Sequence, residues 1–156
     1  MHSTPSVLRS ALARTVQVKG ETQRSEDYLE AIYRLVQENG YATTLDIAER
    51  LEVGAPSVSS MVKHLANGGY LSYEPYRGMK LTEKGEKVAK SVVSRHEILM
   101  EFLTMIGVDS ATAYIDAEGI EHHLHPQTTR ALERLTAALN KDQHLLKHLR
   151  EYMKRE

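Results

Sequence analysis

Apolar residues recur three and four positions apart between Ser25 and Asn39, which is the spacing of one buried face on an α-helix. Ser25 is a typical N-cap residue, and Gly40 is a typical residue just beyond a helix end. Residues 1–24 show weaker periodicity, so we expect a mobile arm or a loosely docked short helix there. The first strongly predicted element is therefore a helix over residues 25–39.

The next apolar stripes predict two short helices. One is predicted to be capped by Thr44, and the other begins at Ala55, where Pro56 suits the first helical turn because its missing amide hydrogen costs nothing. The connection between them, residues 52–54, is tight and ends in glycine. This arrangement predicts a helix-turn-helix.

After Gly69 the polarity pattern changes to alternation, which is typical of β-strands. Residues 70–81 read as two strands around the turn that begins at Pro75. A β-hairpin directly after a helix-turn-helix is a wing, so residues 25–90 are predicted to form a winged-helix domain.

The remaining pattern is helical throughout. A long helix is expected from Glu83 to Ile106, capped by Thr82 and ended by Gly107, and three shorter helices follow from Asp109 or Ser110, from Pro126 and from about Asp142. Within one subunit the leucine-rich faces of the short helices have only the long helix to bury against. A second copy of the chain would cover them, and two-fold dimers are the commonest assembly of this kind.

Chemistry-bearing residues gather in the stretch Ile115–Leu124. Glu118, Glu121 and His122 stand at i, i+3 and i+4, so a helix would place them in one sector where they could share a metal ion. A solvated helix face that binds nothing is the alternative. His96 falls on the apolar side of the long helix, where a lone histidine is more often a core residue than a ligand.

Composition narrows the class of protein. The chain has 156 residues, 41% of them apolar and 26% charged, which is ordinary for a soluble protein. It has no cysteine, which excludes disulfides, thiolate zinc sites and a cysteine nucleophile. No stretch is long and apolar enough for a membrane span or a secretory signal, so we expect a cytoplasmic protein.

Charge is distributed unevenly. Proteins that bind nucleic acid usually have a basic surface, and the formal net charge of −1 argues against such a surface over the whole chain. Residues 1–24 nevertheless carry four bases against one acid, and residues 53–82 carry Lys63, Arg77 and Lys80 against Glu74 alone. The second helix of the predicted helix-turn-helix and the wing are therefore locally basic.

Taken together, the order of parts resembles the diphtheria-toxin-repressor family of metal-dependent transcriptional regulators, and within it the manganese-responsive branch. The resemblance runs from about Ser25 to the C-terminus, and the segments that carry it are SEDYLEAIY, the helix-turn-helix, EPYRGMKLT, RHEILMEFL and DAEGIEHHL. It implies a mainly α chain with an N-terminal arm (1–24), a winged helix-turn-helix DNA-binding domain (25–90) and an all-helical metal-binding and dimerisation domain (91–156).

The resemblance also implies two Mn²⁺ ions per subunit. One ion would be bound by Asp27, Glu118 and Glu121, and the other by Glu30, His96, Glu121 and His122, so Glu121 would bridge them. Where iron-sensing relatives have a methionine and a cysteine, this chain has Asp27 and Glu118. Carboxylate and imidazole ligands suit Mn²⁺ and Fe²⁺, whereas thiolates favour softer ions.

The function that follows is a homodimeric repressor that binds double-stranded operator DNA when Mn²⁺ is bound and controls metal uptake genes. The third helix would enter the major groove, and the wing would reach phosphate or the minor groove. The candidate DNA-contacting residues are Ala55, Pro56, Ser57, Ser59, Ser60, Lys63, Tyr76, Arg77 and Lys80. The short hydroxyl of Ser60 discriminates bases poorly by itself.

Three alternatives are compatible with the same residues. An iron-dependent repressor of the same family differs only in its metal, and a winged-helix regulator without metal would use the acids and histidines structurally. A dinuclear carboxylate-bridged metalloenzyme would use them for redox or hydrolytic chemistry. The doubled Glu-x-x-His pattern of such enzymes is absent and nothing marks a substrate pocket, so no small-molecule substrate is expected. No membrane partner is expected either, because no long apolar stretch is present.

Overall fold

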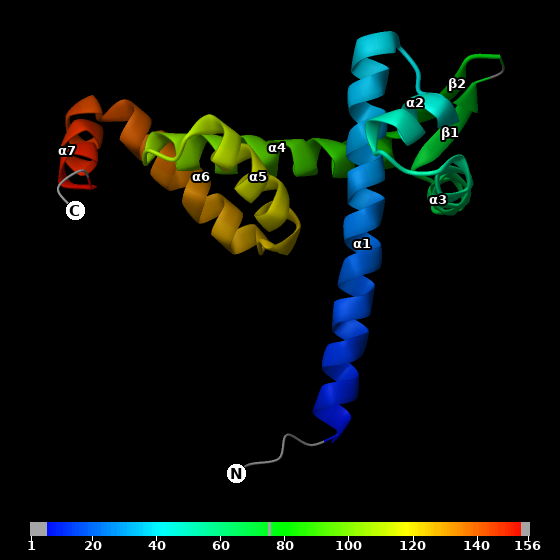
Figure 1. Cartoon of the computed structure of the whole chain (residues 1–156), viewed down its shortest axis with the longest axis horizontal. Helices are drawn as coiled ribbons and strands as arrows, with labels where there is room; N and C mark the ends of the chain where they lie inside the picture. Colours follow the sequence, from blue (N-terminus) through cyan, green and yellow to red (C-terminus); the bar gives the residue numbers. More distant parts are fainter. Residues whose placement is uncertain (1–5, 75, 154–156) are drawn as a thin grey trace. The chain divides into compact units, whose positions relative to one another are not determined.

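The structure is a computed structural model that describes residues 6–74 and 76–153, with the backbone alone described at 6–21 and 74 (Figure 1). The chain divides into two compact units, Met1–Lys90 and Ser91–Glu156, and the division falls within helix α4 (Glu83–Met105). The predicted mainly α fold class, with a winged helix followed by a helical unit, is confirmed. Among the described residues, no helix is both long enough and apolar enough to cross a membrane.

Helix α1 (Ser6–Asn39) begins far earlier than the sequence pattern predicts. The N-cap prediction at Ser25 is wrong, because the backbone is helical on both sides of this residue. Its hydroxyl instead donates to the Met61 sulfur at 3.9 Å. Apart from Gly20, residues 6–24 contain no strong helix breaker, and one interior glycine costs only about 1 kcal/mol. The part of the predicted arm before residue 6 lies outside the described residues.

Helices α2 (Thr44–Arg50) and α3 (Ala55–Asn67) form the predicted helix-turn-helix. The cap of α2 is Thr43 rather than Thr44: the Asp46 amide donates to the Thr43 hydroxyl at 3.2 Å, and the Thr43 amide donates to the Asp46 carboxylate at 2.9 Å. This reciprocal pair is a capping box. In the turn, the left-handed residue is Glu52 (φ 53°), whereas Gly54 (φ −69°) is the N-cap of α3.

The wing consists of β1 (Leu71–Glu74) and β2 (Gly78–Leu81), paired antiparallel as predicted. The Met79 amide donates to the Ala42 carbonyl at 2.9 Å, and the Ala42 amide donates back at 3.0 Å, which ties β2 to the segment between α1 and α2. A Cβ at Gly78 would lie only 2.5 Å from that carbonyl oxygen, so only glycine permits this approach.

An apolar core holds the first unit together. Its buried members come from α1, α2, α3, both strands and the start of α4, and they include Leu29, Ile32, Ile47, Val58 and Leu65. The apolar stripes of the sequence therefore face this core, except that the prediction of an inward-facing Leu45 is wrong, because this side chain is 74% exposed.

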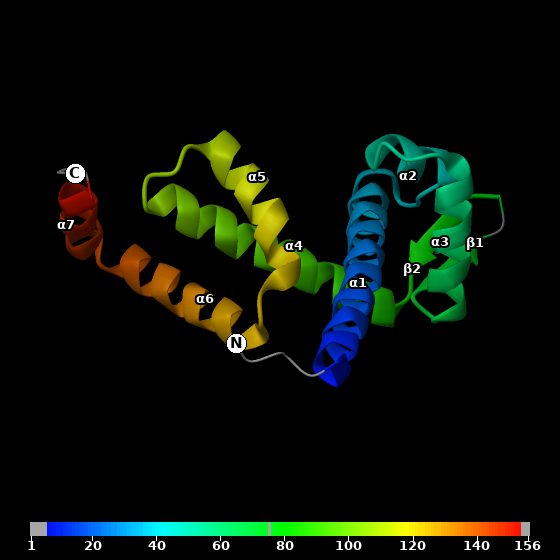
Figure 2. The ribbon, with the colours of Figure 1, turned by 60° about the horizontal axis from the view of Figure 1, so that its bottom comes forward.

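The second unit contains the later part of α4, then α5 (Ser110–Ile120), a short 3₁₀ turn η1 (Glu121–His123), α6 (Pro126–Lys141) and α7 (Gln143–Met153) (Figure 2). Asp109 caps α5 by accepting from the amides of Ala111 and Thr112, both at 3.1 Å. A small apolar cluster of Met105, Leu139 and Leu146 joins α4, α6 and α7.

Candidate metal centre

The backbone around the predicted ligands is not one continuous α-helix. Glu118 lies in the last turn of α5, whereas Glu121 and His122 lie in η1, so the expectation of a single α-helix through all three is wrong. The Glu121 amide still donates to the Ala117 carbonyl. A tightened turn brings residues i and i+3 into line, which keeps Glu118 and Glu121 on the same side.

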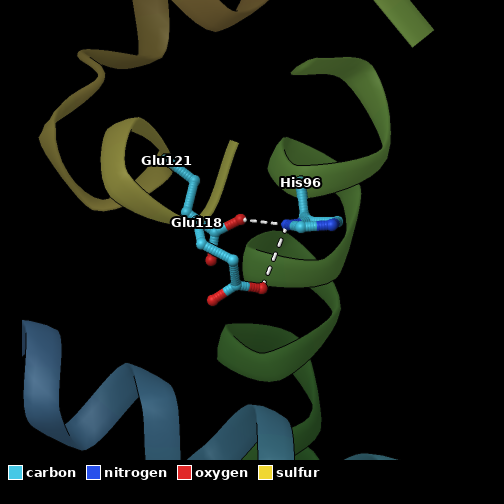
Figure 3. Close-up of side chains that lie close together, drawn as sticks. All are labelled: His96, Glu118 and Glu121. Atoms are coloured by element: carbon cyan, nitrogen blue, oxygen red, sulfur yellow. Dashed lines mark hydrogen bonds and ion pairs between the residues drawn. The ribbon is translucent and has the colours of Figure 1, made fainter. Parts of the chain in front are cut away.

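Three of the predicted ligands converge within the second unit (Figure 3). The Nδ1 atom of His96, on α4, lies 2.9 Å from Oε2 of Glu121 and 3.4 Å from Oε1 of Glu118. One ligand atom from each residue lies within 4.8 Å of the others, which is close enough for all three to bind one ion. His96 thus belongs to this cluster of candidate ligands and is also a buried residue.

Burial differs sharply within this group. Glu121 is 0% exposed and His96 is 6% exposed, whereas the side chain of Glu118 is 44% exposed. A carboxylate removed from water is tolerated only when it is paired with opposite charge or hydrogen-bond donors. The imidazole of His96 and, when bound, a cation would both satisfy this requirement for Glu121.

The fourth predicted ligand, His122, contacts the other oxygen of Glu121. Its Nε2 atom lies 3.3 Å from Oε1 of Glu121, an ion-pair distance, and its side chain is 3% exposed. The two oxygens of Glu121 therefore face two different imidazoles. His122 thus brings a second imidazole against the same buried carboxylate.

Sequence reasoning missed one neighbour of this group. The ring of Tyr114 meets the ring of His96 edge-on, with centroids 5.1 Å apart and planes at 69°. Tyr114 precedes Glu118 by four residues, so helical spacing could have placed it on the same face of α5. The contact restricts the rotation of the His96 ring.

The two remaining predicted ligands, Asp27 and Glu30, lie in the first unit on α1. Glu30 is 9% exposed, and its Oε1 accepts from Nε and Nη2 of Arg34 at 2.9 and 2.7 Å. Sequence analysis did not single out Arg34, although a spacing of four residues is the signature of such a pair. Asp27 lines a surface hollow of about 770 Å³ together with Ser57 and Ser60.

The predicted DNA-contacting residues lie on the surface of the first unit. All six on α3 are exposed, while Val58, Val62 and Leu65 on the opposite side of that helix are buried. Tyr76 and Arg77 are exposed at the tip of the wing, and Lys80 is partly buried on β2. The candidate contacts are Ala55, Pro56, Ser57, Ser59, Ser60, Lys63, Tyr76, Arg77 and Lys80.

The donor set is chemically selective. It contains carboxylate oxygen and imidazole nitrogen, and the chain has no thiol to offer. Such ligands suit Mn²⁺ and Fe²⁺ better than they suit ions that prefer sulfur. The residues present in the second unit therefore fit a hard or borderline divalent cation.

Two protein-family models match the chain. The model described as "Iron dependent repressor, N-terminal DNA binding domain" matches residues 21–79. The model described as "Iron dependent repressor, metal binding and dimerisation domain" matches residues 82–150.

Similar proteins include two bacterial regulators. The HTH-type transcriptional regulator MntR of Shouchella clausii (strain KSM-K16) is 47% identical over 134 residues, which cover 86% of this chain and 94% of that protein. The HTH-type transcriptional regulator MntR of Bacillus subtilis (strain 168) is 54% identical over 103 residues, which cover 66% of this chain and 72% of that protein.

Solved structures also resemble the chain. The manganese regulator SloR matches with a TM-score of 0.63 and 30% identity over 71% of this chain and 52% of that one. A structure described as a manganese-dependent transcriptional repressor in complex with manganese matches with a TM-score of 0.64 and 27% identity, over 72% of this chain and 52% of that one. The chain thus spans about half the length of these two solved chains.

Proposed function

The chain belongs to the iron-dependent repressor family, also called the diphtheria-toxin-repressor family, and from this premise we propose that it is a Mn²⁺-dependent transcriptional repressor. It would act in the cytoplasm as a homodimer on double-stranded operator DNA and control metal uptake genes. The observation that carries the proposal is Glu121, a fully buried carboxylate whose two oxygens face the imidazoles of His96 and His122. As a member of a family of transcriptional regulators, it is not an enzyme.

We assign the metal ligands as Asp27, Glu30, His96, Glu118, Glu121 and His122, with two Mn²⁺ ions per subunit and Glu121 as the bridge. The close approach of His96, Glu118 and Glu121 supports this assignment. The bound ions would supply positive charge that neutralises the carboxylates. The chain's own residues select the ion by offering oxygen and imidazole nitrogen without sulfur.

Manganese is favoured over iron by two further observations. MntR is named a transcriptional regulator. SloR is described as a manganese regulator, which supports manganese as the metal. By the family resemblance, iron-sensing relatives carry softer ligands at the positions that hold Asp27 and Glu118 in this chain. Intrinsic affinity ranks Mn²⁺ below the later first-row ions, so coordination number and metal supply must complete the selectivity.

Metal would act on DNA binding in two ways. Two divalent ions add four positive charges to a formal net charge of −1, which favours approach to a polyanion. The assigned ligands are spread from Asp27 to His122, so a bound ion would narrow the range of conformations of the chain and favour those that fit DNA. The exposed hydroxyls and Lys63 of α3 would then lie in the major groove, with Arg77 of the wing on the backbone.

The test is DNA binding by metal-free protein titrated with buffered Mn²⁺, using an operator selected from random duplexes. We expect Mn²⁺ to strengthen binding at least about tenfold, a coupling of about 1.4 kcal/mol. Glu121→Gln should lose this response, while Glu133→Gln, which changes an exposed acid on α6, should keep it.

Two outcomes would contradict the proposal in different ways. Operator affinity that is unchanged by Mn²⁺ and by a chelator would remove the sensor function altogether. A stronger response to Fe²⁺ than to Mn²⁺ at equal free concentration would leave a repressor but assign it to iron.

A further inference from the structure

Two histidines outside the metal centre lie together on α7. His144 and His148 are four residues apart, and their ring centroids are 4.5 Å apart with the ring planes tilted by 31°. Both residues are exposed. Neither takes part in the ligand set assigned above.

Helix α7 is anchored through its opposite side. Leu146 is 5% exposed and packs with Met105 and Leu139, and Nε of Arg150 donates to the Met105 carbonyl at 2.9 Å. At 100° per residue, the two histidines fall on the side of the helix away from Leu146. The pair is thus presented to solvent by a helix that is held in place.

The start of α7 is also fixed. The Leu145 amide donates to the Asp142 carboxylate at 2.9 Å, which satisfies one of the free amides of the first turn. His144 lies in this first turn and His148 in the next. The spacing between the two rings is therefore maintained by an ordered backbone.

Two imidazoles on successive turns are a chelating group for late first-row cations. Zn²⁺ binds histidine nitrogen at about 2.0–2.1 Å, and imidazole suits copper, nickel and zinc. Ions late in the series bind nitrogen far more strongly than Mn²⁺ does, so this pair should bind Cu²⁺ or Zn²⁺ more tightly than Mn²⁺.

A third ligand is within reach along the helix. Glu151 follows His148 by three residues and therefore lies on the same side of α7. Its carboxylate is 4.0 Å from the Lys147 ammonium, and both side chains are more than half exposed. Such an exposed pair contributes little, so the carboxylate can leave it at small cost.

We propose that His144 and His148, with Glu151 as an additional oxygen ligand, form a second metal site that takes Cu²⁺ or Zn²⁺ in preference to Mn²⁺. The ion would cross-link two turns of α7. Because the pair is assembled only when the helix is formed, binding would stabilise the helix by mass action.

The test is a titration of metal-free full-length protein with Cu²⁺, followed by electron paramagnetic resonance. Wild type should bind one more Cu²⁺ per chain than His148→Gln or His144→Gln, and each variant should lose the coupling to two nitrogens that this additional ion contributes. Cu²⁺ affinity of this site should fall at least about tenfold in each variant. His125→Gln, which removes an exposed histidine at the start of α6, is the matched control and should behave as wild type.

A second measurement uses stability. Zn²⁺ should raise the unfolding temperature of wild type more than that of His148→Gln, whereas Mn²⁺ should raise both equally. Equal Cu²⁺ stoichiometry and equal nitrogen coupling in wild type and the variants would mean an adventitious ion only and would overturn the proposal.

Discussion

The two units of the chain bury different chemistry. Large side chains that are fully enclosed in the first unit are apolar, as Ile32, Ile47 and Leu65 illustrate. In the second unit a comparably enclosed side chain is the carboxylate of Glu121, and the described apolar cluster there has only three buried members. Apolar residues such as Val92 and Leu99 are buried in the second unit too, so the difference lies in its fully enclosed carboxylate.

Under the proposed function, the core of the first unit has a structural role and the core of the second unit binds metal. Burial of apolar area stabilises a fold regardless of metal, at roughly 25 cal/mol per Å². A buried ion pair contributes little net stability compared with apolar residues of similar volume, but removing one partner is costly. The enclosed carboxylate of Glu121 therefore adds little net stability to the second unit, and under the proposed function its role is to bind the cation.

The largest effect is expected from breaking the pair in the second unit. His96→Leu should destabilise this unit by about 3–5 kcal/mol, because Glu121 loses the imidazole that lies 2.9 Å away while remaining buried. Hydrogen exchange measured by mass spectrometry over α5 and η1 reports the loss locally. Peptides from α2 and α3 in the first unit, measured in the same experiment, provide the internal control.

The double variant His96→Leu/Glu121→Leu sharpens the comparison, because it makes the second core apolar like the first. It should recover most of the lost protection while losing Mn²⁺ binding. If the double variant is less stable than His96→Leu, the cost does not come from an unpaired buried carboxylate.

A cavity in the apolar core of the first unit should lower the free energy of unfolding by a similar or smaller amount. Ile47→Ala removes a fully buried side chain and should cost about 2–5 kcal/mol. Mn²⁺ should not restore this loss in the peptides of α2, because the damage is to apolar packing. Leu45→Ala, at a site that is 74% exposed on the same helix, is the matched control.

The capping box of α2 should contribute less. Thr43→Ala removes the hydroxyl that accepts from the Asp46 amide and should cost about 1 kcal/mol in chemical unfolding of the first unit. Thr44→Ala changes the adjacent residue and leaves the box intact. Equal losses in the two variants would contradict the assignment of Thr43 as the cap.

The smallest effect concerns Asp109, the cap of α5. Hydrogen bonds from the Thr112 hydroxyl and from backbone amides hold the pKa of this carboxyl below its ordinary value of 3.8. A lowered folded-state pKa means that the stabilisation is complete above that ordinary value and is lost as the pH falls below it. The difference in melting temperature between wild type and Asp109→Asn should therefore shrink between pH 5 and pH 3, and a constant difference would contradict the argument.

Periodicity and local chemistry predicted much of this molecule. The recognition helix, the wing and the start of α4 follow from patterns that depend on a few neighbouring residues, such as Pro56 and Thr82. Ser25 was misread because a good capping residue is also tolerated inside a helix when no break precedes it. The change to a 3₁₀ turn at Glu121 has no local signal of this kind.

The candidate site was predicted in its residue types but not in its surroundings. Family resemblance supplied the ligand set, and helical spacing supplied the shared face of Glu118 and Glu121. Neither gave the unequal burial of those two carboxylates, because burial depends on packing between distant segments. The edge contact of Tyr114 and the pairing of Arg34 with Glu30 both had sequence signals, but such spacings also occur throughout ordinary helices.

The pairing of Arg34 with Glu30 bears on how such a sensor could be retuned over evolution. A cation that binds Glu30 must compete with a guanidinium tethered one helical turn away, so the arginine would raise the metal concentration at which the protein responds. Arg34→Met should then lower the Mn²⁺ concentration needed for half-saturation, and an unchanged or higher value would exclude this role. A lineage facing a different metal supply could thus shift its threshold through one codon, without altering a ligand or the DNA-binding surface.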